Sequence, residues 1–157
     1  MVITRATISD AQEILDLQKL AYQSEAAIYQ DYTIPPLTQT LPEMKVELQN
    51  QLFLKAVAAG QIVGSVRAYL QQGTCYIGRL IVHPDQQNRG LGRKLMGAIE
   101  ECFPQALCFA LFTGHLSKRN LYLYEKLGYR QVSMDRVSEK LTMVFLEKSV
   151  TDNPHLP

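Results

Sequence analysis

The sequence predicts an α/β fold in which a mixed central sheet of about six to seven strands carries helices on both faces. Short apolar runs separated by Ala59-Gly60 and Gln72-Gly73 are typical of an antiparallel meander in the N-terminal half. The last run of this meander leads into a glycine-containing turn and an amphipathic helix. An apolar strand follows that helix, and such a crossover places it parallel to the strand before the helix.

One domain is expected over residues 1–148, because the 157 residues suffice for a full core and no linker, repeat or low-complexity segment divides them. Residues 149–157 are polar, contain two prolines and are expected to form a loose tail. Turn signals and apolar patterning predict strands over residues 2–6, 53–58, 62–70, 76–82, 106–113, 129–134 and 141–147.

Two capping-box patterns predict the helices of the N-terminal half. Ser9 with Gln12 predicts a helix that runs to about residue 24, and Thr40 with Glu43 predicts one that runs to about residue 51. Residues 24–37 connect them and contain two tyrosines, two acids and a Pro-Pro pair. This connection is either a surface segment whose tyrosines pack on the core or part of a binding site.

The helix predicted over residues 91–103 begins with features of an anion-binding site. Its apolar residues recur at helical spacing, and the next residue is a proline. Gly90 and Gly92 leave the backbone open to a ligand. Arg89 and Arg93 add positive charge at the end where a helix normally prefers negative charge. Together these features favour a phosphate site, whereas the alternative is a solvated helix with ordinary surface charge.

The common nucleotide-binding motifs do not match this segment. The P-loop pattern is absent. A dinucleotide fold requires a third glycine or alanine where Leu95 stands, and no acidic residue for a ribose follows the strand that ends near Thr113. A nucleotide-binding α/β protein is therefore disfavoured.

Residues 80–92 read L-x-V-x-P-x-x-Q-x-x-G-x-G and resemble the signature of the GNAT superfamily of N-acetyltransferases. Residues 123–129, LYEKLGY, resemble a second sequence block of that family. Residues 117–127 are accordingly expected to form a helix that ends at Gly128. The resemblance implies that the strands at 76–82 and 107–113 splay apart and that the thioester of acetyl-CoA lies between them.

The resemblance also implies the cofactor contacts. Backbone amides from Gln87 to Arg93 would hold the pyrophosphate of acetyl-CoA, and the central strand would pair with the pantetheine arm. Ser117 stands where many family members carry asparagine, and Asn120 follows three residues later. The cofactor-binding residues implied are Leu80, Ile81, Val82, Gln87, Asn88, Arg89, Gly90, Leu91, Gly92, Arg93, Ser117, Asn120 and Tyr124.

For catalysis, the resemblance implies that Tyr124 is the general acid that protonates the leaving thiolate. The alternative is a core tyrosine on an amphipathic helix. A backbone N–H of Leu80 or Ile81 would stabilise the oxyanion. Many family members carry a glutamate just before Leu80, but Gly78 and Arg79 stand here, so the general base is left open. Candidates for the base are His115, Glu25, Asp31 and His83, or a water chain to a more distant group.

By the same resemblance, the acceptor amine binds near residues 24–37. Glu25 and Asp31 would attract a cationic amine, and Tyr29, Tyr32 and Ile34 would pack against its apolar part. The implied reaction is direct attack of a primary amine, of a small molecule or a peptide, on acetyl-CoA in a ternary complex. A non-catalytic CoA-binding regulatory or interaction module is the alternative.

Composition disfavours several other classes of protein. The net charge of +1 gives no support for nucleic-acid binding or an electrostatic membrane anchor. No apolar run reaches the roughly 18 residues that span a membrane. Three scattered histidines give no metal-ligand pattern, so no metal is expected. Three cysteines without Cys-x-x-Cys spacing suggest reduced thiols in a cytoplasmic protein. A homodimer is expected only from the family resemblance.

Overall fold

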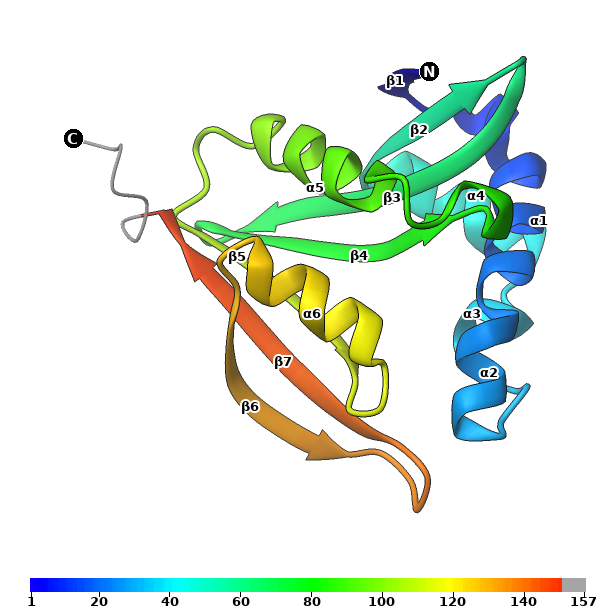
Figure 1. Cartoon of the computed structure of the whole chain (residues 1–157). Coiled ribbons are helices and arrows are strands. Elements are labelled where there is room, and N and C mark those ends of the chain that lie inside the picture. Colours follow the sequence, from blue (N-terminus) through cyan, green and yellow to red (C-terminus); the bar gives the residue numbers. More distant parts are fainter. Residues whose placement is uncertain (151–157) are drawn as a thin grey trace.

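The computed structural model describes residues 1–150, which form a seven-stranded sheet with helices on both faces (Figure 1). The spatial order of the strands is β1-β2-β3-β4-β5-β7-β6. The strands are β1 Val2–Arg5, β2 Leu52–Ala58, β3 Gln61–Gln71, β4 Thr74–Val82, β5 Cys108–Gly114, β6 Arg130–Arg136 and β7 Thr142–Ser149. The predicted fold class, a mixed α/β sheet with helices on both faces, is confirmed.

Helices cover the sheet in two groups. The α-helices are α1 Ala11–Ala21, α2 Gln23–Tyr29, α3 Pro35–Thr38, α4 Leu41–Asn50, α5 Leu91–Glu101 and α6 Lys118–Lys126, with 3₁₀ helices at Ile8–Asp10 and Pro84–Gln86. Ile62 of β3 belongs to the apolar cluster under α1 and α4, whereas its neighbour Val63 belongs to the cluster under α5. Because successive strand residues point to opposite faces, α1 and α4 cover one face and α5 covers the other.

The two central strands separate as the family resemblance implied. β4 and β5 are parallel and pair only over Thr74–Tyr76 of β4 and Cys108–Ala110 of β5. Beyond these residues β5 pairs with β7 alone, through Gly114. The edge of β4 that faces β5 is therefore unpaired from about Ile77 to Val82 (Figure 1). This leaves backbone donors and acceptors on β4 available to a ligand.

A bulge interrupts β4 at the start of this unpaired segment. Ser65 of β3 lies opposite Ile81, and Arg67 lies opposite Gly78, so two residues of β4 stand against one of β3. Arg79 adopts a left-handed backbone conformation there, with φ of 50°. The bulge bends β4 at the position where the thioester is expected.

The helical predictions near the N-terminus need two corrections. The Ser9–Gln12 capping box is wrong, because the Asp10 carboxylate instead accepts a hydrogen bond from the Thr7 N–H at 2.8 Å, and α1 begins after Asp10. Residues predicted to form a connection after residue 24 instead lie in α2, which begins one residue after the C-cap Tyr22. The second capping box is confirmed: Thr40 N–H donates to the Glu43 carboxylate at 2.9 Å, and α4 follows.

At the C-terminal end, β7 continues through Ser149, one residue beyond the predicted domain boundary. Val150 N–H then donates to the Leu107 carbonyl at 3.1 Å. The remaining part of the predicted tail, residues 151–157, lies outside the described residues. In the part that is described, no helix has both the length and the apolar character needed to cross a membrane.

Candidate cofactor and acceptor site

A recess of about 420 Å³ opens between the unpaired end of β4, the N-terminus of α5 and one side of α6. Most of the predicted cofactor residues meet here, although they come from three separate elements. The predicted residues that line the recess are Leu80, Ile81, Val82, Gln87, Asn88, Gly90, Leu91, Gly92, Arg93 and Asn120. Arg89, Ser117 and Tyr124 are not among its lining residues.

The loop before α5 has the backbone geometry of an anion site. Asn88 and Gly90 are left-handed, with φ of 64° and 81°. A β-carbon built on Gly90 would meet no atom within 4 Å, so the space beside this backbone is open. The first intrahelical hydrogen bond runs from Lys94 N–H to the Gly90 carbonyl at 3.1 Å. The amides of the preceding turn therefore remain available to an anion.

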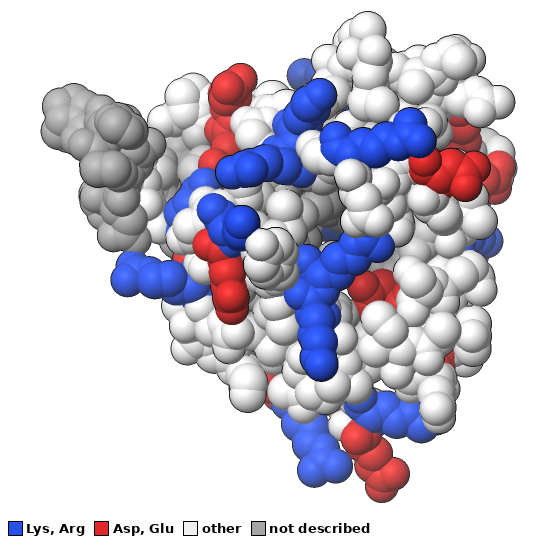
Figure 2. All heavy atoms as spheres, in the orientation of Figure 1, with Lys and Arg blue, Asp and Glu red and all other residues white. Residues whose placement is uncertain are grey.

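Arg119 is a residue of this site that the sequence reasoning did not identify. Its guanidinium donates to Gln87 Oε1 at 2.6 Å and to Asn88 Oδ1 at 2.7 Å, so it ties α6 to the loop before α5. Figure 2 shows Lys and Arg side chains gathered over α5 and α6 around the recess. No sequence pattern marks Arg119, because it is an exposed helix residue whose role depends on a loop about thirty residues away.

Tyr124 is largely buried beside the recess. Its side chain is 7% exposed, and its ring packs edge-on against Tyr129 at a centroid distance of 6.0 Å. Its hydroxyl has no hydrogen-bond partner within residues 1–150, yet no buried polar side-chain atom there lacks one. The hydroxyl oxygen therefore keeps at least a small solvent-accessible surface. Burial, followed by the charges of Tyr22 and Glu25, raises the pKa of Tyr124, so the phenol is protonated at neutral pH.

A chain of hydrogen bonds joins α2 to the start of α6. Leu116 N–H donates to the Tyr29 hydroxyl at 3.0 Å, and this hydroxyl lies 2.7 Å from Ser117 Oγ. Ser117 Oγ donates to the Glu25 carboxylate at 2.6 Å, and Asn120 Nδ2 donates to its other oxygen at 3.2 Å. Residues predicted for the acceptor and for the cofactor are thus in direct contact. Glu25 also lines the recess.

The other candidates for the general base do not line the recess, although the His115 ring lies beside that of Tyr29 at a centroid distance of 5.9 Å. His115 Nδ1 accepts from Thr142 N–H at 3.0 Å. His83 Nδ1 accepts from Asp85 N–H at 3.1 Å. Asp31 accepts from Thr33 N–H at 2.9 Å. Tyr32 is 57% exposed, and neither it nor Ile34 lines the recess. Of the four proposed bases, only Glu25 borders the recess.

Tyr22 is a second residue of the site that the sequence reasoning did not identify. It lines the recess at the junction of α1 and α2. Burial raises the pKa of the Tyr22 hydroxyl, and the charges that act on it include those of Arg79 and Glu25. The Tyr22 hydroxyl is therefore within electrostatic range of positive and negative groups of this region.

The model of the GNAT acetyltransferase domain matches residues 19–150, and the chain belongs to this family. Among the curated proteins it is similar to the UPF0157 protein YqkA of Bacillus subtilis, with 24% identity over 133 residues. This match covers 85% of the chain but only 38% of YqkA, so the chain spans about two-fifths of that relative.

Solved structures share the fold. The PaiA N-acetyltransferase of Thermoplasma acidophilum in complex with coenzyme A has a TM-score of 0.79 at 16% identity, covering 95% of this chain and 99% of that one. YncA of Salmonella typhimurium, a putative acetyltransferase with its cofactor acetyl-CoA, has a TM-score of 0.73 at 21% identity, covering 96% and 94%. The ribosomal-protein-S18-alanine N-acetyltransferase of Escherichia coli has a TM-score of 0.79 at 13% identity, covering 95% and 93%.

Proposed function

We propose that this protein is an acetyl-CoA-dependent N-acetyltransferase that acetylates a primary amine by direct attack in a ternary complex. The observation that carries the proposal is the recess in which the unpaired edge of β4 meets the open loop before α5. A pantetheine arm can pair with the unpaired edge of β4, while the amides of the loop donate hydrogen bonds to a pyrophosphate. The coenzyme A and acetyl-CoA complexes of PaiA and YncA support this choice of cofactor.

In this proposal each catalytic group is assigned a role from its position at the recess and, for Tyr124, from its protonation state. A backbone N–H of Leu80 or Ile81, next to the β4 bulge, stabilises the oxyanion. Tyr124 keeps its proton at neutral pH and donates it to the departing thiolate. Glu25 is the carboxylate at the recess, held by Ser117 and Asn120, and accepts the proton of the attacking amine directly or through water.

The alternative is a module that binds CoA without turnover. The observation in its favour is that Arg79 stands where many family members carry an acid, so the usual base is missing from β4. Glu25 and the solvent contact of the Tyr124 hydroxyl favour catalysis instead.

Removal of the Tyr124 hydroxyl distinguishes an acetyltransferase from a module that only binds CoA. Tyr124→Phe is expected to lower kcat by about 10²- to 10⁴-fold, the usual contribution of a positioned acid. Acetyl-CoA should still raise the melting temperature of this variant. Tyr69→Phe, which changes a tyrosine on β3 that does not line the recess, is the matched control. An unchanged kcat in Tyr124→Phe would remove this residue as the acid. A parent protein that binds acetyl-CoA but acetylates none of a broad panel of amines would establish the module.

A further inference from the structure

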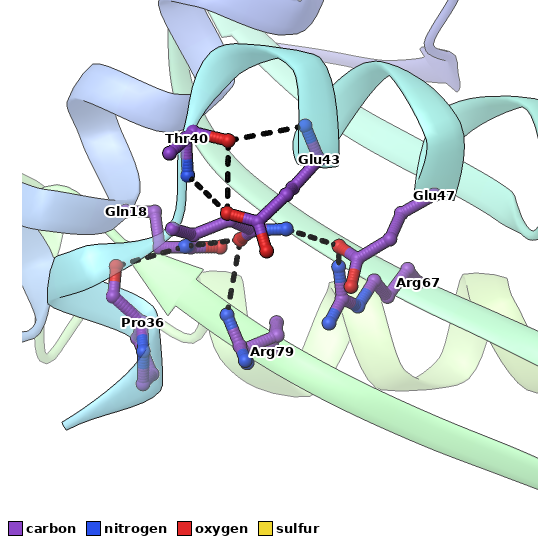
Figure 3. Close-up of polar contacts among 8 residues, drawn as sticks. Gln18, Pro36, Thr40, Glu43, Glu47, Arg67 and Arg79 are labelled. Atoms are coloured by element: carbon purple, nitrogen blue, oxygen red, sulfur yellow. Dashed lines mark hydrogen bonds and ion pairs between the residues drawn. The ribbon is translucent and has the colours of Figure 1, made fainter.

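Arg79 lies on β4, near the part of the recess where the acceptor amine is proposed to bind. It stands one residue before Leu80, the first β4 residue that lines the recess. The bulge turns its side chain toward the face of the sheet that α1 and α4 cover, where its guanidinium donates to Gln39 Oε1 at 3.3 Å (Figure 3). Gln39 connects α3 to α4. At this bulge Arg79 has a left-handed backbone conformation, which is uncommon for a residue with a β-carbon.

Neighbouring side chains fix the orientation of Gln39. The buried Gln18 amide donates to Gln39 Oε1 at 2.8 Å and to the Pro36 carbonyl at 2.9 Å. Gln39 Nε2 donates to the Glu47 carboxylate at 2.6 Å (Figure 3). Gln39 therefore presents its oxygen, a neutral acceptor, to Arg79, while its Nε2 donates to the Glu47 carboxylate.

The charges of this network do not balance. Glu47 forms an ion pair with Arg67 of β3 and also accepts the hydrogen bond from Gln39. Arg79 forms no ion pair within residues 1–150. Burial, followed by the positive charge of Arg79, lowers the pKa of Arg67 to about 10. Glu47 thus pairs with Arg67 alone, and Arg79 is a partly dehydrated guanidinium with no carboxylate partner within residues 1–150.

Arg79 has hydrogen-bond donors to spare. A guanidinium carries five N–H groups, and Arg79 uses one of them in a bond of 3.3 Å, longer than the usual range for N–H···O bonds. No buried polar side-chain atom in residues 1–150 lacks a partner, so the remaining nitrogens of Arg79 reach solvent. A purely structural role for Arg79 would therefore depend on one long bond to a neutral group.

A carboxylate, Glu25, borders the recess beside this region. Leu80, the residue after Arg79, lines the recess together with Tyr22 and Glu25, and the charges of Arg79 and Glu25 both act on the Tyr22 hydroxyl. Glu25 attracts an ammonium group, and the free fork of Arg79 matches a carboxylate in two-point geometry. We infer that the acceptor carries both an amine and a carboxylate, that Arg79 binds this carboxylate, and that amino acids are the substrate class. This inference rests on the proposed acetyl transfer.

A paired substrate series tests the inference. Thiol release from acetyl-CoA is measured with the common L-amino acids, each paired with its carboxamide and its decarboxylated amine. At least one free amino acid should have a KM about 10- to 100-fold below that of its carboxamide, the range expected for a hydrogen-bonded ion pair. Acids, amides and amines that react equally well would overturn the inference and leave the acetyltransferase proposal intact.

Variants of Arg79 test whether this residue causes the preference for a free amino acid over its carboxamide. Arg79→Gln should bring the ratio of the two KM values toward one, and Arg79→Lys, which keeps the charge but loses the fork, should restore it in part. Arg5→Gln removes a positive charge from β1, at the far edge of the sheet, and should leave the ratio as in the parent. A ratio that persists in Arg79→Gln would refute the role of Arg79.

A binding measurement covers the case in which no compound is turned over. The melting temperature is then recorded with CoA and each amino acid together. A further rise with an amino acid, absent with its carboxamide and absent in Arg79→Gln, supports the inference, whereas no further rise overturns it. A parent protein whose melting temperature does not respond to acetyl-CoA or CoA would instead refute the proposed function itself.

Discussion

Gly90 offers the sharpest test of the cofactor loop, because the chain contains a matched control for it. Gly90, in the loop before α5, and Gly60, in the β2–β3 turn, have φ of 81° and 77°. A β-carbon on either would meet no atom within 4 Å. Alanine at either position therefore brings backbone strain without steric overlap in the free protein. Each substitution should lower the free energy of unfolding by about 1–2 kcal/mol, the cost of a left-handed L-residue.

Acetyl-CoA should distinguish the two variants. At 100 times its Kd, a ligand stabilises the folded state by about 2.7 kcal/mol, which is a melting shift of about 5–11 °C for a chain of this size. A methyl group on Gly90 would occupy the space beside the phosphate-binding backbone, and we expect it to weaken binding at least tenfold. At the same ligand concentration the stabilisation then falls to about 1.4 kcal/mol or less, a shift of no more than about 3–6 °C.

The assay is thermal unfolding of Gly90→Ala, Gly60→Ala and the parent, each with and without acetyl-CoA. Gly60→Ala should melt lower than the parent without ligand but respond to acetyl-CoA as the parent does. Equal responses of both variants would show that the loop backbone does not contact the cofactor. A Gly90→Ala protein that loses no stability without ligand would refute the reasoning from backbone conformation.

Two further predictions concern stability alone. Gly97 lies in the middle of α5, is exposed and has open space around an added β-carbon, so Gly97→Ala should raise the free energy of unfolding by about 0.5–1 kcal/mol in denaturant titrations. Although burial opposes it, hydrogen bonds from Thr7 and Lys55 lower the pKa of Asp10 in the folded state below its ordinary value of 3.8. The stability from this group is present above that ordinary value and is lost as the pH falls through the lower folded value. Asp10→Asn should therefore be less stable than the parent at neutral pH, and the difference should shrink below about pH 4.

Most residues that line the recess on the β4 and α5 side could be predicted from sequence because the signals there are local. One short segment contains Gly90, Gly92 and the strand before them. The helical spacing of the apolar residues of α5 shows which side of this helix is buried. The Thr40–Glu43 capping box was predictable for the same reason, since it involves only neighbours in sequence. Competition between equivalent local patterns explains the error at Ser9, since Thr7 and Asp10 form the capping box of the preceding 3₁₀ helix instead.

The acceptor half depends on contacts that no local pattern contains. α2 is seven residues long and buries only Ala26 and Tyr29, too few positions for a recognisable periodicity. Its position is set by hydrogen bonds to Leu116 and Ser117, which are almost ninety residues away in the chain. The partners of Arg79 likewise come from α1 and from the link between α3 and α4. In the sequence, Arg79 was notable only because it stands where many family members carry glutamate.

The chain departs from the family pattern at two positions, with Ser117 in place of asparagine and Arg79 in place of glutamate. These long-range contacts connect the two. Ser117 is small and 2% exposed, and it is enclosed by the hydroxyl of Tyr29 and the carboxylate of Glu25. The larger amide that many family members carry there would compete with both groups for this space. The serine thus allows α2 to bring a carboxylate to the recess, while β4 presents Arg79 instead of an acid. In the proposed site, Glu25 of α2 would supply the acid that many family members carry on the strand, where this chain has Arg79.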